Sequence, residues 1–505
     1  MQIKDTNTDR RGFLRMTACA LGAALLPQSD ALWANSPNRP NIVLILADDL
    51  GYGDPCCYNG QSKIPTPAID RLAAEGVRFT DAHTPSAVCT PTRYGLLTGR
   101  YCWRSPLKSG VLWGYSEPLI ETGRLTIASM LKQHGYATGC IGKWHLGLGW
   151  IRKDDQKKPE AENIDWTKPV THGPQSVGFD YSYVIPASLD MDPYCWLENG
   201  SLVEAPTDYT TGSKRRWDGG GGFWRAGPVA PSFDFTGVLP TITKKSIHFV
   251  KHQSRDKPFF LHVCLTAPHT PWMPTKEFCG KTEVGWYGDF VTQVDASIGQ
   301  IVEAVDEAGL RNDTLLIVTS DNGSHWPIEQ VKKFGHRANS HWRGQKADIY
   351  DGGHRVPFIC RWPGRIEPGT QSEQLICLTD VMATCAAIIG EVLPADAGQD
   401  SVNILPVMFK PHLGKPVREA VVHHSYDGMF AIRQGPWKLI QGRGSGGFTE
   451  PSRIKPEPSE PQGQLYNLND DPGEQKNLWA ERPEIVKRLT NSLDRYKRQG
   501  YSRSM

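Results

Sequence analysis

The stretch Asn41-Ile42-Val43-Leu44-Ile45-Leu46-Ala47-Asp48-Asp49-Leu50-Gly51 decides the fold class. From Ile42 to Ala47 every side chain is apolar and several are β-branched, which is the pattern of a strand buried on both faces. Two carboxylates follow at once. Strands buried on both faces occur mainly in sheets that helices cover on two sides, so we predict an α/β protein with a mostly parallel sheet.

The rest of the first four hundred residues repeats this alternation. A helix is expected to start at Thr66-Pro67 and to run through Ile69, Leu72 and Ala73. Further strands are predicted at residues 137–141, 259–265, 314–320 and 356–360. Further helices are predicted at residues 126–134 and 289–308. The alternation predicts an α/β sheet that is mostly parallel.

Two segments depart from this rhythm. Residues 194–231 contain glycines and several tryptophans and are predicted to form a loop inserted over one end of the sheet. After residue 406, short strands are predicted at residues 420–424, 430–433 and 437–441, followed by a helix at 483–498. We therefore divide the chain into residues 1–34, a large α/β domain at 35–408, and a smaller C-terminal α+β domain with an antiparallel sheet at 409–505.

Composition excludes several classes of function. The 505 residues contain 56 Lys and Arg against 54 Asp and Glu, a net charge of +2, so no broad field favours nucleic acid or an anionic membrane. The twelve cysteines show no Cys-x-x-Cys metal spacing and are too few for a disulfide scaffold, and most are expected in the core. An anionic substrate must be held by local charges.

The amino terminus reads as an export signal. Arg10-Arg11-Gly12-Phe13-Leu14 precedes an apolar stretch at residues 16–26 and small residues near Ala34, which is the pattern of a twin-arginine signal. The stretch is shorter than the about 20 apolar residues that a membrane span needs. We expect a soluble, periplasmic or secreted protein that starts near Asn35, with no transmembrane segment and with the Tat export machinery as a partner.

Paired polar residues follow two of the predicted strands. Asp48 and Asp49 end the first strand, and Asp321 and Asn322 end the strand at 314–320. Open α/β sheets place ligands at the carboxyl ends of their strands. Each pair alone is also compatible with a turn or a helix cap. Together they supply hard oxygen ligands, which suit calcium or magnesium better than zinc.

Cys89 is expected at the start of a short helix. Thr90 and Pro91 have the character of a helix cap and first helical position, and Gly99 of the helix end. This places Cys89 at the positive end of the helix dipole, with Arg93 one turn further on. Free backbone N–H groups at such an end bind anions.

At these residues the chain resembles the type I, formylglycine-dependent sulfatases of the alkaline phosphatase superfamily, of the arylsulfatase or N-acetylgalactosamine-6-sulfatase kind. Cys89-x-Pro91-x-Arg93 followed by Thr98-Gly99-Arg100 is similar to the signature whose cysteine is oxidised to formylglycine. Six further motifs resemble the family in order: Asp48 to Asp54, Gly142-Lys143-Trp144-His145-Leu146-Gly147, Pro268-His269-Thr270-Pro271, Asp321-Asn322-Gly323, Lys346 with Tyr350 to Gly353, and Leu465 to Glu474. The resemblance covers essentially the whole chain from Asn41.

The resemblance implies the roles of these residues. One calcium ion would be held by Asp48, Asp49, Cys89 as formylglycine, Asp321 and Asn322. Arg93, Lys143 and Lys346 would offset sulfate charge. His269, or Lys346 beside it, would act as the acid and His145 as the base. A formylglycine-generating enzyme is the implied maturation partner. The implied fold is an alkaline-phosphatase-like α/β sandwich with a large mixed, mostly parallel sheet between helices, followed by a smaller domain with an antiparallel sheet and one helix.

Two alternatives remain open for the activity. A phosphate or phosphonate ester hydrolase of the same superfamily makes similar demands on the site, although two-metal phosphatases of this fold carry Asp-His-Gly where this chain has Asp321-Asn322-Gly323. A non-catalytic binder of sulfated glycans is the other. The predicted substrate is a sulfated carbohydrate, and the predicted enzyme is exo-acting. The candidate sugar contacts are Trp113, Tyr115 and His424, with Trp217, Phe223 and Trp224 in the inserted loop.

Overall fold

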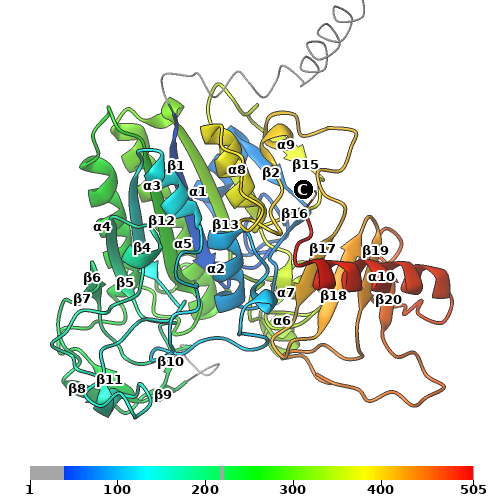
Figure 1. Cartoon of the computed structure of the whole chain (residues 1–505), viewed down its shortest axis with the longest axis horizontal. Coiled ribbons are helices and arrows are strands. Elements are labelled where there is room, and N and C mark those ends of the chain that lie inside the picture. The colour runs from blue at the N-terminus through cyan, green and yellow to red at the C-terminus, as the bar shows by residue number, and fades with distance from the viewer. Residues whose placement is uncertain (1–38, 216–220, 504–505) are drawn as a thin grey trace, which may run out of the picture.

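A ten-stranded sheet runs through the larger part of the protein (Figure 1). The structure, a computed structural model, describes residues 39–215 and 221–503, so the expected signal at 1–34 and Trp217 lie outside the described residues. The strand order is β15 (Thr370–Ser372), β2 (Val77–Phe79), β14 (Phe358–Arg361), β13 (Thr314–Ser320), β1 (Asn41–Asp48), β12 (Phe259–Pro268), β4 (Ala137–Lys143), β5 (Tyr181–Ile185), β6 (Leu197–Glu198) and β7 (Ser201–Leu202).

The five central strands β13, β1, β12, β4 and β5 are parallel, and antiparallel pairs flank them on both sides. β1 is buried along its whole length, as its apolar run predicts. Its register sets Ala47 opposite Ser320 of β13 and Asp48 opposite Pro268 of β12. The ends of three neighbouring strands are therefore level, and the mixed, mostly parallel sheet is confirmed.

Helices cover both faces of this sheet. α1 (Pro67–Glu75), α4 (Val238–Lys251) and α5 (Gly285–Glu307) pack on one face together with Val43 and Ile45 of β1. α2 (Cys89–Thr98), α3 (Ile127–Gln133), α8 (Asp380–Ile389) and α9 (Leu405–Phe409) pack on the other with Ile42 and Leu44. Alternate side chains of one strand thus enter two separate cores, and burying each such side chain contributes about 1.5–3 kcal/mol.

The C-terminal part forms its own small sheet, at the right of Figure 1. β17 (Val421–His424), β18 (Phe430–Gln434), β19 (Trp437–Ile440) and β20 (Gln464–Asn467) are antiparallel. α10 (Pro483–Gln499) buries Leu489, Leu493 and Tyr496 in the core that it shares with this sheet. The predicted antiparallel sheet and closing helix are confirmed, and β20 adds a fourth strand.

The inserted segment is more ordered than the expected loop. β8 (Asp208–Thr210) pairs with β11 (Gly227–Val229), and β9 (Ser213–Lys214) pairs with β10 (Phe223–Trp224). These pairs are short and carry too few residues to show a period in the sequence. The remaining elements are β3 (Ala82–His83), β16 (Ile376–Cys377), α6 (Ile328–Phe334), α7 (Asp351–His354) and the 3-10 turns Cys102–Arg104, Ala161–Asn163, Gln175–Val177 and Arg311–Asp313.

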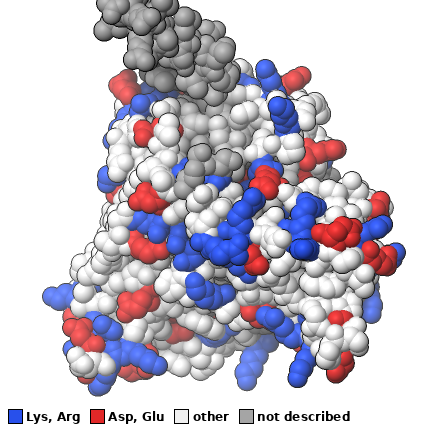
Figure 2. All heavy atoms as spheres, turned by 45° about the vertical axis from the view of Figure 1, so that its right-hand side comes forward, with Lys and Arg blue, Asp and Glu red and all other residues white. Residues whose placement is uncertain are grey.

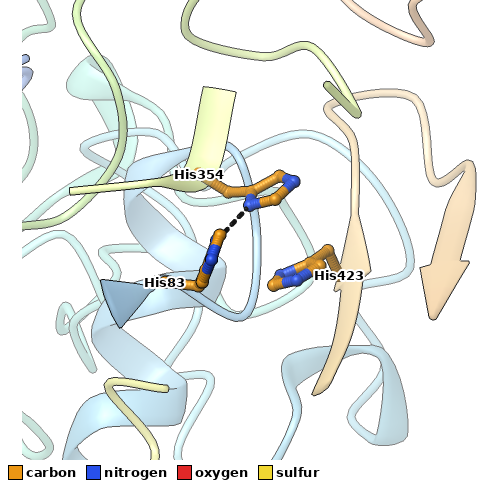
Figure 3. A group of neighbouring side chains, drawn as sticks. All are labelled: His83, His354 and His423. Atoms are coloured by element: carbon orange, nitrogen blue, oxygen red, sulfur yellow. Dashed lines mark hydrogen bonds between the residues drawn. The ribbon is translucent and has the colours of Figure 1, made fainter. Parts of the chain in front are cut away.

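Three buried histidines join the small sheet to the larger domain (Figure 3). His83 comes from β3, His354 from α7 and His423 from β17. His83 Nε2 lies 2.9 Å from an Asp81 carboxylate oxygen and 3.1 Å from Arg433 Nη1, and His83 Nδ1 lies 2.9 Å from His354 Nδ1. His423 donates from Nδ1 to the carbonyl oxygen of Thr84 at 2.9 Å.

The His354 and His423 rings are stacked, while the His83 ring is tilted against them by 45° and 47°, and this arrangement excludes a metal ion shared by all three. The His354 and His423 ring centroids are 3.8 Å apart with an angle of 11° between the planes. Nitrogen lone pairs lie in the ring plane, so two nearly parallel rings cannot both aim at one ion about 2 Å from each nitrogen. Lys438 Nζ also lies 3.1 Å from His354 Nε2. The cluster is a neutral, hydrogen-bonded connection between the small sheet and the segments of β3 and α7.

Charge on the surface is mixed. Lys and Arg side chains gather across the middle of the face in Figure 2, but Asp and Glu are interspersed among them. This agrees with the small net charge and gives no extended field of one sign on that face. Among the described residues, no helix combines the length and the apolar character needed to cross a lipid bilayer.

Candidate active site

The carboxyl ends of the five parallel strands bring the predicted chemical groups together. Asp48 ends β1 and Asp49 follows it, and Asp321 and Asn322 follow β13. His269 follows β12. Lys143 ends β4 and His145 lies two residues after it, while Ser188 follows β5. Each segment is positioned by its own strand, and Leu50 N additionally donates to Ser320 Oγ at 2.9 Å, which ties the β1 and β13 ends together. The site therefore lies where parallel sheets place their ligands.

Each of the two adjacent carboxylates has its own lysine. Lys143 Nζ lies 2.6 Å from Asp48 Oδ2, and Lys346 Nζ lies 2.8 Å from Asp49 Oδ1. Asn322 Nδ2 donates to Asp49 Oδ1 at 2.6 Å. Asp49 has a φ of 65°, a left-handed conformation that costs a non-glycine residue about 1–3 kcal/mol, and these contacts offset that cost.

Burial and the neighbouring charges together leave the pKa of Asp48 lowered and the pKa values of Lys346 and Asp321 raised. Burial alone raises the pKa of Asp48, but Lys143 and the neighbouring cations outweigh it and hold that pKa well below its usual range. Burial lowers the pKa of Lys346, and Asp49 outweighs it in turn, so the pKa is raised. Burial and the Asp48 carboxylate raise the pKa of Asp321. The lysines stay charged, while the carboxylates crowd one another.

Arg93 links α2 to the strand ends. Its Nε and Nη2 donate to Asp321 Oδ2 at 3.0 and 2.7 Å, and its Nη1 donates to the Lys143 carbonyl oxygen at 3.0 Å. Arg93 is fully buried, as are all ten residues of α2. The predicted end of this helix at Gly99 is confirmed by its left-handed φ of 60°.

The predicted cap of α2 is wrong. The helix begins at Cys89 with Val88 as its N-cap and has no side-chain cap. The Thr90 hydroxyl instead donates to the carbonyl oxygen of His145 at 3.1 Å. The hydroxyl that was expected to cap the helix is therefore engaged in a tertiary hydrogen bond. This bond holds the segment after β4 next to Cys89.

The donor atoms fit a hard divalent cation. Asp48 Oδ1 and Asn322 Oδ1 are buried and accept no hydrogen bond from the described residues. Atoms of Asp48, Cys89 and Asp321 lie within 4.8 Å of one another. Buried carboxylates this close repel each other unless a cation lies between them. Oxygen donors of this kind suit calcium or magnesium.

Cys89 has the environment of a side chain that is unreactive as a thiol. It is 2% exposed, and burial raises the pKa of its thiol, so at neutral pH it carries its proton. A protonated thiol is a poor nucleophile and a poor metal ligand. Its position at the start of α2, next to Asp48 and Asp321, therefore does not suit a thiolate nucleophile.

His145 has a ring nitrogen with a free lone pair. Its Nε2 lies 2.8 Å from the carbonyl oxygen of Leu112 and so carries the proton, which leaves the lone pair on Nδ1. Nδ1 is buried and has no partner among the described residues. Burial, Lys143 and Arg93 lower the pKa of His145 well below its usual value.

His269 stands on the other side of the paired aspartates. Its Nδ1 donates to the carbonyl oxygen of Thr270 at 2.6 Å, and its Nε2 lies 3.9 Å from Asp49 Oδ2. Ser188 Oγ lies 3.4 Å from His269 Nδ1 and 3.2 Å from Lys143 Nζ. All ten predicted metal and catalytic residues are thus brought into one connected site.

The three candidate sugar contacts lie in different surroundings. Trp113 is 48% exposed, and Leu112 beside it binds His145. Tyr115 packs toward Trp166 with ring centroids 6.4 Å apart. His424 is buried below the segment before Cys89, where its carbonyl oxygen accepts from Ala87 N at 3.1 Å. Their contact with sugar stays a prediction.

Sequence reasoning missed Ser188, Asp190 and Arg225. The first two follow β5, whose run Tyr181–Ile185 was not identified as a strand, and Arg225 lies in the inserted segment. Recognising β5 as one more parallel strand would have marked the residues after its carboxyl end as site candidates.

Comparisons with known proteins agree with this geometry. The family model described as Sulfatase matches residues 40–391, and a model described as N-sulphoglucosamine sulphohydrolase, C-terminal, matches residues 341–499. An N-acetylgalactosamine-6-O-sulfatase of Bacteroides thetaiotaomicron is 36% identical over 91% of this chain and 93% of its own length. Human arylsulfatase A is 33% identical over 87% of this chain and 83% of its own length.

A solved structure shows the same relationship. It comes from work on the metabolism of multiple glycosaminoglycans by Bacteroides thetaiotaomicron, is 34% identical, and has a TM-score of 0.78 over 91% of this chain and 99% of that chain. The matches extend across both the larger domain and the small C-terminal sheet. The resemblance in the motifs is confirmed: the chain belongs to the sulfatase family and is a sulfuric ester hydrolase.

Proposed function

We propose that this sulfatase removes sulfate from carbohydrates as an exo-acting enzyme, with a formylglycine made from Cys89 as its nucleophile. The observation that carries this proposal is the place of Cys89: at the start of α2, beside the paired aspartates, and within one connected group of three cations. The Sγ atom marks the place that an oxygen of the modified side chain would take.

The cations fit a sulfate ester. A sulfate monoester presents negative oxygens that must be neutralised while sulfur is attacked. Lys143, Lys346 and Arg93 approach from three different segments and are all buried, so their charges act in a water-poor environment where they are strong. The raised pKa of Lys346 favours a charge-neutralising role for it over proton donation.

A divalent cation, which we propose to be calcium, would be held by Asp48, Asp49, Asp321, Asn322 and residue 89. It would supply Lewis acidity and a fixed template for the sulfate oxygens. The support is the oxygen donor set and the two buried acceptor atoms without protein partners.

The first half-reaction moves sulfate to residue 89. A hydrated formylglycine at residue 89 would supply the nucleophilic oxygen for attack on sulfur, and a cation held by Asp48, Asp49, Asp321 and Asn322 would make that hydroxyl acidic enough to lose its proton to water. The bond from sulfur to the sugar oxygen breaks, and His269, on the other side of the paired aspartates, gives a proton to the departing alcohol.

The second half-reaction releases sulfate. His145 Nδ1, which carries a free lone pair, takes the proton of the remaining hydroxyl. The bond from residue 89 to the sulfate would then break, and the aldehyde would be restored with sulfate as the leaving group. An ordinary serine or cysteine has no second hydroxyl and would remain sulfated until water arrived.

The carbohydrate part rests on the relatives and on the inserted segment. One relative is named an N-acetylgalactosamine-6-O-sulfatase, and one solved structure comes from work on glycosaminoglycan metabolism. Trp113 offers an exposed indole ring next to the residue that binds His145. We propose an N-acetylgalactosamine- or galactose-like sulfated sugar as the substrate.

We also propose export through the Tat machinery and maturation by a formylglycine-generating enzyme. Support for export is the Arg10-Arg11 pair with the apolar stretch behind it. Replacing both arginines by lysine should leave the protein in the cytoplasm, as cell fractionation would show. Periplasmic recovery of that variant would argue against this route.

The test of the function combines mass spectrometry with substrate assays. The tryptic peptide Phe79–Arg93 contains Cys89, and protein made with the maturation enzyme should show the mass of an aldehyde in place of the thiol. The same protein is then assayed on sulfated monosaccharides, an aryl sulfate and the matching phosphate esters. Aldehyde formation with calcium-dependent release of sulfate from sugars supports the proposal, while an unmodified active thiol or faster phosphoester cleavage overturns it.

A further inference from the structure

Asp190 carries a buried carboxylate oxygen that no described residue binds. The residue is 4% exposed and lies two positions after Ser188, which contacts both Lys143 and His269. Oδ2 accepts from Arg225 Nη1 at 2.6 Å, whereas Oδ1 is buried without a partner among the described residues. An unbound buried acceptor is unfavourable, so a donor is expected there when the site is filled.

Arg225 is held rigidly beside this carboxylate. Its backbone N–H and its Nη1 both donate to the Asp190 carbonyl oxygen, at 3.2 and 3.1 Å. Its guanidinium carbon lies 4.9 Å from the ring centre of Trp113 and 5.2 Å from that of Phe223. The side chain remains 34% exposed, and its Nε and Nη2 donate to no described residue. Donors are therefore available beside the free oxygen.

Three segments meet at this point. A side chain placed on Gly114 would lie 1.9 Å from the Asp192 carbonyl oxygen, and one on Gly227 would lie 2.4 Å from the Asp192 side chain. The segment with Trp113, the segment after β5 and the inserted segment are therefore in close contact. Since Leu112 binds His145 and Ser188 contacts His269, this assembly borders the catalytic groups on two sides.

The chemistry of the pair selects a hydroxyl. Asp190 and Arg225 together carry no net charge, so the pair does not attract a second sulfate or a carboxylate. Such an anion would also be repelled by the free Oδ1 of Asp190. A hydroxyl can donate to Oδ1 and accept from the guanidinium at once. The exposed indole of Trp113 offers an apolar face on which a sugar ring can pack.

We propose, on the basis of the carbohydrate function above, that Asp190 and Arg225 bind one hydroxyl of the sulfated sugar while Trp113 packs on its ring. This makes the pair a specificity-determining site that senses the configuration of a carbon other than the one carrying the sulfate. Sites built to bind a hydroxyl discriminate strongly against analogues that lack it, because their own polar groups are then left unpaired.

The test compares Asp190→Asn and Arg225→Gln with the matured wild-type enzyme. The substrates are sulfated hexoses that differ by inversion or removal of a single hydroxyl, with 4-methylumbelliferyl sulfate as a substrate without hydroxyls. One position should matter to the wild type, with a fall in kcat/KM of about 10- to 100-fold when its hydroxyl is removed. The variants should lose most of that sensitivity, and their activity should fall far more on the sugar than on the aryl sulfate.

The chain offers a matched control in Lys245→Gln. Lys245 also pairs with a carboxylate, Glu198 at 3.1 Å, and lies over a ring, Tyr183 at 4.0 Å, with a similar exposure of 31%. It lies away from the groups described above, so its loss should not change the preference among sugars. Trp286→Ala, at an exposed tryptophan of α5, serves in the same way for Trp113→Ala.

The outcomes separate this proposal from the function on which it rests. Equal losses on sugar and aryl sulfate in Asp190→Asn would mean that Asp190 acts through His269 or the fold, and would overturn the hydroxyl site. Unchanged sensitivity to every deoxygenated sugar would overturn it as well. A wild-type enzyme that hydrolyses the aryl sulfate but no sulfated sugar would overturn the carbohydrate function, and this site with it.

Discussion

Arg93 and Asp321 bind each other through one carboxylate oxygen, with Nε and Nη2 of the arginine at 3.0 and 2.7 Å from Oδ2. The two residues are 228 positions apart, and neither is exposed. This contact fixes the rotation of α2, and therefore the direction of residue 89, relative to the end of β13. It also leaves Asp321 Oδ1 toward Asp49, whose backbone N–H lies 3.3 Å from it.

Arg93→Lys should separate the positional role of this contact from its charge. A lysine keeps the charge but cannot form the two-nitrogen contact, so we expect kcat/KM to fall by about 100-fold or more with a folded protein. Arg93→Ala leaves the Asp321 carboxylate buried without its partner and should lower the free energy of unfolding by about 3–5 kcal/mol. Steady-state kinetics and denaturant unfolding measure the two effects. Wild-type activity in Arg93→Lys would contradict the positional role.

Removal of divalent metal should destabilise the protein. The carboxylates of Asp48, Asp49 and Asp321 crowd one another, and a cation that binds only the folded state adds about 3 kcal/mol when its free concentration is 100 times its Kd. Chelation should therefore lower the Tm, and calcium should restore it. In Asp48→Asn the response should be much smaller, whereas His423→Gln should keep it, because that histidine belongs to the histidine cluster. An unchanged Tm after chelation would exclude the metal site.

His145→Ala should stall the reaction after its first half. Without the lone pair on Nδ1, nothing described beside residue 89 takes the proton of the second hydroxyl, so sulfate should remain attached. After a brief exposure to substrate, the peptide Phe79–Arg93 of matured enzyme should carry the added mass of a sulfate. His269→Ala is the matched variant, in which transfer itself is slowed and no sulfated peptide should accumulate. Normal turnover in His145→Ala would refute the role of this base.

Mild acid should weaken the contact that the three clustered histidines make between the small sheet and the segments of β3 and α7. Burial, followed by the charge of Arg355, lowers the pKa of His83 to about 4, whereas the unfolded value is about 6.5. Above pH 6.5 the His83 imidazole is neutral in both the folded and the unfolded protein. Between pH 6.5 and 4 it is protonated in the unfolded protein but stays neutral in the folded protein. Stability is therefore lost with falling pH, by about 2 kcal/mol at pH 5 for this one group.

His83→Gln should accordingly show a shallower loss of unfolding free energy between pH 6.5 and 4 than the wild type. Equilibrium denaturation at several pH values measures that slope. The exposed His172, replaced in the same way, is the control and should leave the slope as it is. Equal slopes for His83→Gln and the wild type would mean that this histidine does not contribute to acid sensitivity.

The sequence predicted those parts of the site whose residues sit directly at the ends of strongly apolar strands. Asp48 and Asp321 were placed correctly because an apolar run next to a carboxylate is a local pattern, and parallel strands end at a common edge. Residues 194–231 were predicted as a loop because the short pairs β8 with β11 and β9 with β10 depend on contacts distant in sequence.

Residues that act through tertiary contacts were beyond local patterns. The cap of α2 was wrong because Thr90 is engaged by the carbonyl of His145, 55 positions away. The proposed role of Asp190 depends on its contact with Arg225 and on its burial, and neither can be predicted from the local sequence. The three clustered histidines come from β3, α7 and β17, and nothing in the spacing of His83, His354 and His423 indicates that they meet.

The burial of Cys89 imposes an order of events on the making of this enzyme. At 2% exposure, inside a helix whose every residue is covered, its sulfur is out of reach of another protein's catalytic groups. The proposed oxidation therefore has to take place on the newly made chain, before α2 is enclosed by the strands that bind it. A molecule that folds with a thiol at position 89 should therefore stay unmodified, even when the maturation enzyme is added afterwards.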